Sequence, residues 1–395
     1  MIWLVLRATA QATMVVLLAQ DLGAQGYGQF VAALAVVGFF TPLAALGLGP
    51  LLLRDGARQP QTLPRQVGMA LALWWPAVWI FSLIAALIAY WSLPTALPLG
   101  ILAAFALGEV LSTSLIELAG RIAQSQQRVR TFGVLQAGLM FARLFALLVY
   151  AALFAPSPSG WMMVYSGISL IYAAFVATRL VRAFHPLWPE QRNWALIKEG
   201  FPFTAGALSF RLQAEFNKPV LAQLGYAQAG AYGIAQRLID LASLPLTALQ
   251  EALWPRVFAA QRPGTSLLHT GGFLVLLALG IGGALAWAAP LLVWLLGFDY
   301  GESARVLTWL AFFPAVQVLR NLANAWLIAQ KFSQSLLVVH GVAVVAGVSL
   351  TLWLIPRFGL AGAAWAMYGS EMSALFVQWA LAIHHRSTQI KKAKT

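Results

Sequence analysis

The feature that most constrains this chain is a series of apolar runs of about twenty residues, separated by short polar breaks. A helix of that length crosses about 30 Å of hydrocarbon. The chain is 61% hydrophobic and only 9% charged, whereas about a quarter of the residues in a soluble domain are charged. The sequence therefore predicts an all-α membrane protein with many spans and argues against a soluble enzyme.

The runs predict twelve transmembrane helices in two pseudo-symmetric six-helix lobes around a central cavity. The predicted spans are 1–20, 29–53, 67–91, 95–119, 131–154, 161–183, 201–222, 229–254, 271–297, 303–329, 333–355 and 360–383. The corresponding domains are an N-terminal lobe (1–184), a cytoplasmic connection (185–200), a C-terminal lobe (201–384) and a basic cytoplasmic tail (385–395).

Basic residues are concentrated in alternate loops. The even-numbered loops and the tail hold Arg54, Arg58, Arg65, Arg121, Arg128, Arg130, Arg179, Arg182, Arg192, Lys198, Arg256, Arg262, Lys331, Arg386, Lys391, Lys392 and Lys394. The odd-numbered loops hold only Arg305 and Arg357. Because Lys and Arg accumulate in the cytoplasmic loops of membrane proteins, both termini are expected in the cytoplasm. The net charge of +13 then reflects topology, and no nucleic-acid partner is expected.

Other residue types give weaker signals. The chain has no cysteine, so disulfides and thiolate metal sites are excluded. The first run lacks the cationic region of a secretory signal and is predicted to be a retained helix. Tryptophans near predicted span ends are interpreted as interface anchors; they are Trp74, Trp75, Trp91, Trp161, Trp188, Trp254 and Trp294.

A glycine-rich phrase occurs twice. Leu18-Ala-Gln20 recurs as Leu221-Ala-Gln223, 203 residues later. Further matches at or near this spacing are Pro42–Leu46 with Pro245–Leu249, Tyr165 with Tyr368, and Tyr27-Gly28 with Tyr232-Gly233. The matches predict two copies of one six-helix unit, running parallel and related by an axis along the membrane normal. We expect the glycines to permit a tight turn and a close helix approach, and the two prolines to bend equivalent helices.

The repeated phrase and the last span also carry a resemblance. The phrase Leu22-Gly-Ala-Gln-Gly-Tyr-Gly28, the segment Phe40–Gly47 and the entry to the last span, Phe358-Gly-Leu-Ala-Gly-Ala-Ala-Trp-Ala366, are similar to Wzx-type polysaccharide and O-antigen flippases. These proteins belong to the multidrug/oligosaccharidyl-lipid/polysaccharide exporter superfamily. The resemblance implies a carrier in the bacterial inner membrane that moves an undecaprenyl-diphosphate-linked oligosaccharide to the periplasmic leaflet for lipopolysaccharide or other surface polysaccharide.

Independently of the resemblance, ionisable residues occur inside predicted spans. Each costs about 2.5–3.5 kcal/mol at a helix centre on insertion scales, so such residues usually face a partner or a wet cavity. The basic ones are Arg7, Arg143, Arg211, Lys218, Arg237 and Arg320, and the main acidic ones are Glu109, Glu215, Asp240 and Glu371. Several lie in stripes at helical spacing, among them Arg211, Glu215 and Lys218, and Gln317, Arg320, Asn321 and Asn324. The stripes predict a central water-filled cavity.

Two interpretations of these charges stay open. Arg211 with Glu215, and Arg237 with Asp240, are spaced as self-neutralising pairs that lock helices together. Arg143 and Arg320 have no acidic residue at helical spacing and are stronger cavity candidates. Arg7 lies near the predicted cytoplasmic end of its helix, where its side chain can also snorkel to the interface.

A substrate site follows from this chemistry. Guanidinium groups bind phosphate through paired, charge-assisted hydrogen bonds, and amides suit sugar hydroxyls. The predicted substrate-binding residues are Arg7, Gln11, Arg143, Arg211, Lys218, Arg237, Arg320, Asn321 and Asn324. The predicted ion-coupling residues are Glu215, Asp240, Glu371 and Glu109. Transport is expected by alternating access, with no catalytic residue, metal or cofactor.

The same residues and loop lengths bear on four other functions. A multidrug exporter of the same superfamily would favour acidic residues in its cavity. A lipid II flippase would, by resemblance, have two further helices. A membrane glycan polymerase or glycosyltransferase needs a larger aqueous region than these short loops provide, and intramembrane charges argue against a structural scaffold. A polysaccharide polymerase and glycosyltransferases are the protein partners that the sequence leaves open.

Overall fold

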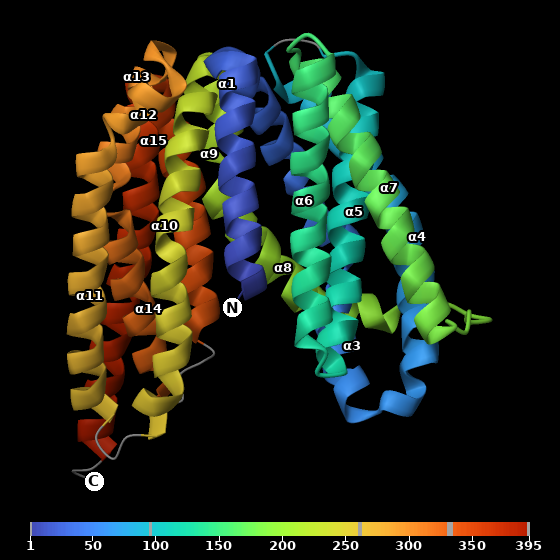
Figure 1. Ribbon diagram of the computed structural model, residues 1–395. Coiled ribbons are helices and arrows are strands. Elements are labelled where there is room, and N and C mark those ends of the chain that lie inside the picture. The colour runs from blue at the N-terminus through green and yellow to red at the C-terminus, as the bar shows by residue number, and fades with distance from the viewer. Residues whose placement is uncertain (1, 95–96, 260–262, 330–334, 393–395) are drawn as a thin grey trace. The chain divides into compact units, whose positions relative to one another are not determined.

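The computed structural model describes residues 2–94, 97–259, 263–329 and 335–392, and the regular structure in these ranges is helical. Side chains are not described at 4, 251–252, 254–268, 328–337, 382 and 384–395. The interpretation of Trp254 and the charges of the predicted basic tail therefore lie outside the described side chains. Figure 1 shows the helices with their labels.

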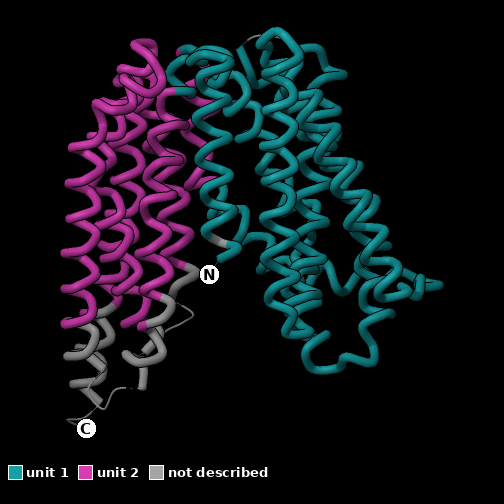
Figure 2. The backbone as a smooth tube through the Cα atoms, in the orientation of Figure 1, with its two compact units in different colours: residues 1–211, 225–230 teal, residues 212–224, 231–395 magenta. Residues whose placement is uncertain are grey.

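The chain forms two compact units (Figure 2). Unit 1 comprises residues 1–211 and 225–230, and unit 2 comprises residues 212–224 and 231–395. The predicted connection at 185–200 thus lies wholly within unit 1. The chain passes from one unit to the other inside helix α8 (Ala195–Glu215), after residue 224, and inside helix α10 (Tyr226–Ala259).

Unit 1 is built on long apolar helices. Its elements are α1 (Ile2–Gly38), α2 (Phe40–Ala45), α3 (Leu48–Arg58), the 3₁₀ turn η1 (Pro60–Thr62), α4 (Leu63–Ser92), α5 (Leu99–Ser125), α6 (Val129–Leu153), α7 (Pro158–Phe184) and most of α8. Helix α5 packs against α3, α4, α6 and α7 and is central to the unit. Small residues allow these close contacts: a methyl group at Gly108 of α5 would lie 2.8 Å from the Cα atom of Ser166 on α7.

Unit 2 is built around the longest helix. Its elements are α9 (Asn217–Ala222), most of α10, α11 (Pro263–Ala288), α12 (Leu291–Leu296), the 3₁₀ turn η2 (Phe298–Tyr300), α13 (Gly301–Leu310), α14 (Phe313–Ala329) and α15 (Ser335–Lys392). Helix α15 packs against α9, α13 and α14, and α11 packs against α13 and α14.

The helix boundaries follow from local sequence. Gly23 (φ +65°) and Gly359 (φ +55°) adopt left-handed backbone inside α1 and α15 and kink them. Both sit in the polar breaks that separate predicted spans. At the start of α7, the Ser157 side chain accepts a hydrogen bond from the Gly160 backbone N–H, and Pro158 occupies the first helical position. At Gly23, Gly359 and Ser157, the chain therefore bends or starts a helix in a predicted polar break.

Eight helical ranges among the described residues are long and apolar enough to cross a membrane. Two of them, Val5–Arg58 with 54 residues and Val338–Leu381 with 44 residues, are much longer than one crossing requires. Helices α8 and α10, which hold the predicted seventh and eighth spans, are absent from these eight ranges. Both carry several charged residues. The twelve-helix, two-lobe arrangement stays a prediction.

The two glycine-rich phrases pack against each other within unit 1. A methyl group placed on Gly28 would lie 1.7 Å from the backbone oxygen of Tyr226, and one on Gly230 would lie 2.5 Å from the oxygen of Ala24. The Gln25 side chain also accepts a hydrogen bond from the Ala227 backbone N–H at 3.2 Å. The expected close helix approach is confirmed, since only a hydrogen atom fits at Gly28.

The structural match between the phrases follows a spacing of 202 residues. Gly225 (φ +145°) stands where Gly23 stands in the first phrase, and Gly230 where Gly28 stands. The expected equivalence of the two prolines is not seen. Pro42 lies in the short helix α2, between breaks at Phe39 and Leu46, whereas Pro245 lies in α10, which is helical throughout.

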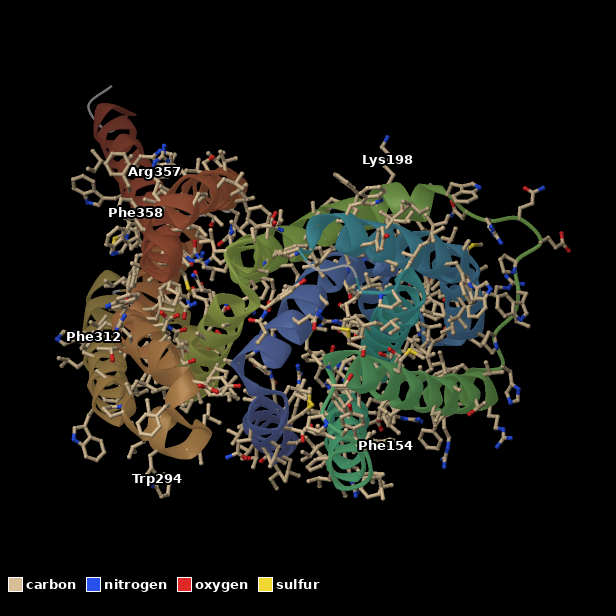
Figure 3. All side chains as sticks on the ribbon, turned by 90° about the horizontal axis from the view of Figure 1, so that it is seen from above. Phe154, Lys198, Trp294, Phe312, Arg357 and Phe358 are labelled. Carbon is tan, nitrogen blue, oxygen red and sulfur yellow. The ribbon has the colours of Figure 1, made fainter. Side chains whose placement is uncertain are left out.

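The tryptophans separate into two groups. Trp91 and Trp294 are 81% and 85% exposed, as interface anchors would be, and Trp294 is labelled in Figure 3. Trp161 is fully buried and Trp74 is 4% exposed, with its indole N–H donating to the Ser114 hydroxyl at 2.8 Å. The anchor interpretation is therefore wrong for these two. Both side chains belong to the packed interior of unit 1.

We predict that Gly28→Ala destabilises the protein by about 1–3 kcal/mol or more, the usual cost of overpacking. The added methyl group meets backbone, which cannot move aside without separating α1 from α10. Gly167→Ala is the control, because a methyl group there meets nothing within 4 Å. Thermal unfolding in detergent measures both variants, and equal melting temperatures would contradict the close approach.

Candidate functional site

A buried ion pair joins α5 to α6 in unit 1. The Arg143 Nη2 atom lies 2.7 Å from Glu109 Oε2, and the two side chains are 6% and 7% exposed. Arg143 also donates to the hydroxyl of Ser169 on α7 at 2.9 Å and to that of Ser112 at 3.2 Å. Thr113 donates to the other Glu109 oxygen at 3.0 Å. One salt bridge with its hydrogen bonds thus ties three helices together.

Aromatic side chains enclose this pair. The Tyr165 hydroxyl donates to Glu109 Oε2 at 2.7 Å, and the Arg143 guanidinium lies 4.1 Å from the centre of the Tyr165 ring. Tyr165 packs in turn against Phe30, Phe105 and Trp161. Arg143 is thus buried and has an acidic partner on a neighbouring helix, although none lies at helical spacing in the sequence.

Arg211 is the basic residue that differs from the others. It lies on α8 in unit 1, half-buried, with Nη1 3.4 Å from the position of a methyl group on Gly38 of α1. It contributes a Coulombic interaction at Glu109. Among the described residues of unit 1, no carboxylate lies within 4.0 Å of it. The Glu109–Arg143 pair is already neutral, so Arg211 leaves a positive charge in this part of unit 1.

The first helix supplies two further predicted residues. Arg7 and Gln11 are both half-buried on α1, and Arg7 takes part in an interaction within the protein. They lie one helical turn apart and share a face.

Four charged residues of unit 2 form a neutral group. Lys218 is 1% exposed and forms an ion pair with Glu215, which is 9% exposed. Arg237 Nη2 lies 3.3 Å from Glu215 Oε1, and Arg237 Nη1 lies 3.9 Å from Asp240 Oδ2. Glu215 therefore joins two basic residues, one of them on α10, which helical spacing alone does not reveal. The Arg237–Asp240 pair predicted from spacing is present, but its contact is the longer one.

The break between α8 and α9 explains why these charges meet. Pro219 lacks the N–H that would bond to the Glu215 carbonyl. Across the break, the Gln236 side chain donates to the Ala214 carbonyl at 2.6 Å. Asn217, at the start of α9, donates to the Tyr232 hydroxyl at 2.7 Å and accepts from the Thr351 hydroxyl at 2.6 Å. A hydrogen-bonded network thus joins α9, α10 and α15.

The predicted stripe on α14 is present, and its side chains have partners on other helices. Arg320 Nε lies 3.0 Å from Glu371 Oε2 on α15, and Arg320 Nη1 donates weakly to Gln213 at 3.4 Å. The two charged side chains are 16% and 8% exposed. Arg320 therefore has an acidic partner, although none lies at helical spacing in the sequence.

Asn321 and Asn324 of the stripe form hydrogen bonds with two glutamines, Gln250 and Gln378, that the sequence analysis did not identify. Asn321 donates to Gln250 of α10 at 3.1 Å, and Gln378 of α15 donates to Asn324 at 2.5 Å. Asn321 and Asn324 are half-buried, whereas Gln250 and Gln378 are 4% and 2% exposed. Polar amides within otherwise apolar spans were the sequence signal that could have identified them. We refer to these four residues as the amide cluster.

The four intramembrane acids are thus all paired, while six basic residues leave an excess of positive charge. Each of the four predicted coupling carboxylates has a basic nitrogen within 4.0 Å: Glu109, Glu215, Asp240 and Glu371. In unit 2, the four charged residues around Glu215 have no net charge, and the amide cluster is uncharged. In unit 1, Arg211 carries a positive charge near the neutral Glu109–Arg143 pair. Such an arrangement favours an anionic ligand over a cationic one.

Comparison with known proteins identifies the fold. No family model matches the chain, and no curated protein matches its sequence. Solved structures do match over nearly the whole length. An inward-facing multidrug resistance MATE family transporter of the MOP superfamily has a TM-score of 0.70 at 14% identity, covering 98% of this chain and 96% of that one.

Two further structures agree. The lipid II flippase MurJ, in an inward closed conformation, has a TM-score of 0.78 at 11% identity, covering 96% of this chain and 86% of MurJ. The MATE multidrug transporter DinF-BH has a TM-score of 0.65 at 16% identity, covering 97% and 93%. The chain therefore has the fold of MOP-superfamily transporters, and these neighbours are transporters and flippases rather than enzymes.

We predict that Arg143→Met destabilises the protein by about 3–5 kcal/mol, because it leaves Glu109 charged and buried without its partner. The double variant Arg143→Met/Glu109→Gln should recover most of this loss. Arg121→Met is the control, since its contact with Glu117 is 4.0 Å and part-exposed and is worth at most about 1 kcal/mol. Thermal unfolding in detergent measures the set, and a double variant no more stable than the single one would contradict the assignment.

Proposed function

We propose that this protein is a flippase for an undecaprenyl-diphosphate-linked oligosaccharide, acting in surface polysaccharide biosynthesis in a bacterial inner membrane. The fold of MOP-superfamily transporters supports a carrier. One neighbour is named a lipid II flippase, which supports a lipid-linked cargo. The sequence resemblance to Wzx-type proteins points to the same class of substrate.

Arg211 is the observation that carries the proposal. It is half-buried in the membrane region without a carboxylate within 4.0 Å among the described residues of its unit. An uncompensated charge there is costly unless a ligand or water neutralises it. A diphosphate offers several oxygens to the planar guanidinium group, which binds such oxygens in pairs. Arg211 is therefore the proposed primary phosphate ligand.

The other basic residues have different roles in this proposal. Arg7, Arg237 and Arg320 are less completely buried than Arg143 and Lys218, and with Gln11 they are proposed to contact the diphosphate and its first sugars. Arg143 and Lys218 are buried in ion pairs. We propose that they contribute to the field around the substrate without contacting it.

Coupling is proposed to act through the paired acids. Protonation of Glu371 would release Arg320, and protonation of Glu215 would release Arg237 and Lys218, because each carboxylate neutralises those groups directly. Asp240 and Glu109 are the other candidates. A proton taken from one side of the membrane would thereby raise the positive charge available to the phosphate groups. Alternating access between the two predicted lobes would then carry the bound head group across.

The paired acids also bear on the multidrug-exporter alternative. A cationic drug needs an acid whose charge is not already neutralised, and the four named carboxylates each have a basic partner within 4.0 Å. The six basic residues outnumber these four acids, and Arg211 in particular would repel a cation. This balance favours the flippase over an exporter of cations.

We predict that Arg211→Ala lowers translocation of a labelled lipid-linked oligosaccharide in reconstituted vesicles by about 10- to 100-fold. That range corresponds to the loss of a charge-assisted hydrogen bond worth about 1.5–3 kcal/mol. Arg211→Lys should retain part of the activity, because it keeps the charge but loses the paired geometry.

Arg130→Ala is the matched control, since Arg130 is exposed at the start of α6 and should leave transport unchanged. Full transport by a well-folded Arg211→Ala protein would refute the proposed site. Drug resistance conferred on a sensitive strain, without transport of lipid-linked sugar, would favour the exporter.

A further inference from the structure

The amide cluster of unit 2 is not a closed hydrogen-bonded group. Gln250 Nε2 and Gln378 Oε1 are buried and have no hydrogen-bond partner among the described residues. One is a donor and the other an acceptor. A buried polar atom without a partner costs about 1–3 kcal/mol, so a purely structural cluster would be expected to use both atoms. The cluster is therefore incomplete as it stands.

The arrangement of the four residues indicates where a partner would bind. Asn321 and Asn324 are three residues apart on α14, so their side chains are neighbours, roughly 5–6 Å apart at Cβ. Each is half-buried and forms a hydrogen bond with a buried glutamine of a different helix. Gln250 fixes Asn321, and Gln378 fixes Asn324. The asparagines are the two half-buried members of the cluster, and each is fixed by a hydrogen bond to a buried glutamine.

The chemistry of the cluster selects an uncharged polar ligand. The four residues carry no charge, and the nearest charged member of the stripe, Arg320, has Glu371 within 3.0 Å. Carboxamides present a donor and an acceptor side by side, which matches sugar hydroxyls and the acetamido group of an N-acetylated sugar. A phosphate, which can only accept at its charged oxygens, would leave the acceptor of Gln378 unsatisfied.

We infer that the amide cluster of Gln250, Asn321, Asn324 and Gln378 is a carbohydrate-binding subsite, suited to an N-acetylated sugar of the transported glycan. This inference rests on the proposed flippase function. Asn321 and Asn324 contact the sugar, while Gln250 and Gln378 hold them in place, and their unpartnered atoms lie directly behind the contact. The subsite recognises the neutral part of the cargo.

The test compares two probes on the purified full-length protein. One is undecaprenyl diphosphate carrying an N-acetylglucosamine-containing oligosaccharide, and the other is undecaprenyl diphosphate without sugar. Ligand-induced shifts of the melting temperature, titrated over concentration, give an apparent affinity for each. We expect the wild-type protein to bind the sugar-bearing probe more tightly. Gln378→Met should lose most of that difference, about tenfold, and keep its affinity for the sugar-free probe.

Two further variants sharpen the result. Gln250→Met should behave like Gln378→Met, since it removes the other supporting amide. Gln66→Met, which removes a partly buried amide of α4 whose Oε1 is also unpartnered, should leave both affinities unchanged. Transport with either probe serves as a second readout, in which the sugar-bearing probe should show a raised KM at nearly unchanged maximal rate.

Each failure has a distinct meaning. If wild-type protein binds and transports neither probe, the flippase function itself is refuted. If it binds both probes and the glutamine variants weaken both equally, or neither, the subsite is refuted while the flippase function stands. If both glutamine variants fail to fold, the amides are structural and the inference is overturned.

Discussion

Neutralisation of charge inside hydrocarbon is the constraint on which this structure depends. Each buried acid in the membrane region must be offset close by, because no solvent is present to screen it. In unit 1 this requirement is met by a salt bridge from α5 to α6, reinforced from α7 by Tyr165 and Ser169. These contacts link α5, α6 and α7 at one point within their apolar packing.

Unit 2 meets the same constraint differently. Its acids at Glu215 and Glu371 bind basic residues from neighbouring helices, and the α8–α9 break allows Lys218 to reach Glu215. Because the pairs use up Glu215 and Glu371, the stripe on α14 is left with uncharged amides, Asn321 and Asn324. This division suits a cargo with a charged end and a neutral chain, since each part can be recognised by chemistry of its own kind.

The sequence predicted the helical class and the polar breaks well, because length, hydropathy and glycine act locally. Gly23 and Gly359 bend the chain where the runs end, and the Gly28 phrase makes the close approach expected of it. Partnerships between helices were not predictable. Arg143 and Glu109 are 34 residues apart and show no periodic relation, and the supporting roles of Gln250 and Gln378 depend on neighbours that spacing along one helix does not identify. The prediction that Trp161 is an interface anchor was wrong for the same reason, because its burial depends on neighbouring helices.

One consequence follows from the points at which the chain leaves unit 1. There are two such points, after Arg211 and after Gly230, and they fall within helices α8 and α10 instead of in loops. A helix resists bending far more than a loop does, so it behaves as an elastic rod. This stiffness is interrupted near both crossings, at the Pro219 break after α8 and at Gly225 (φ +145°) before α10. The backbone at the two crossings is therefore stiff along the helices and most compliant at these two residues.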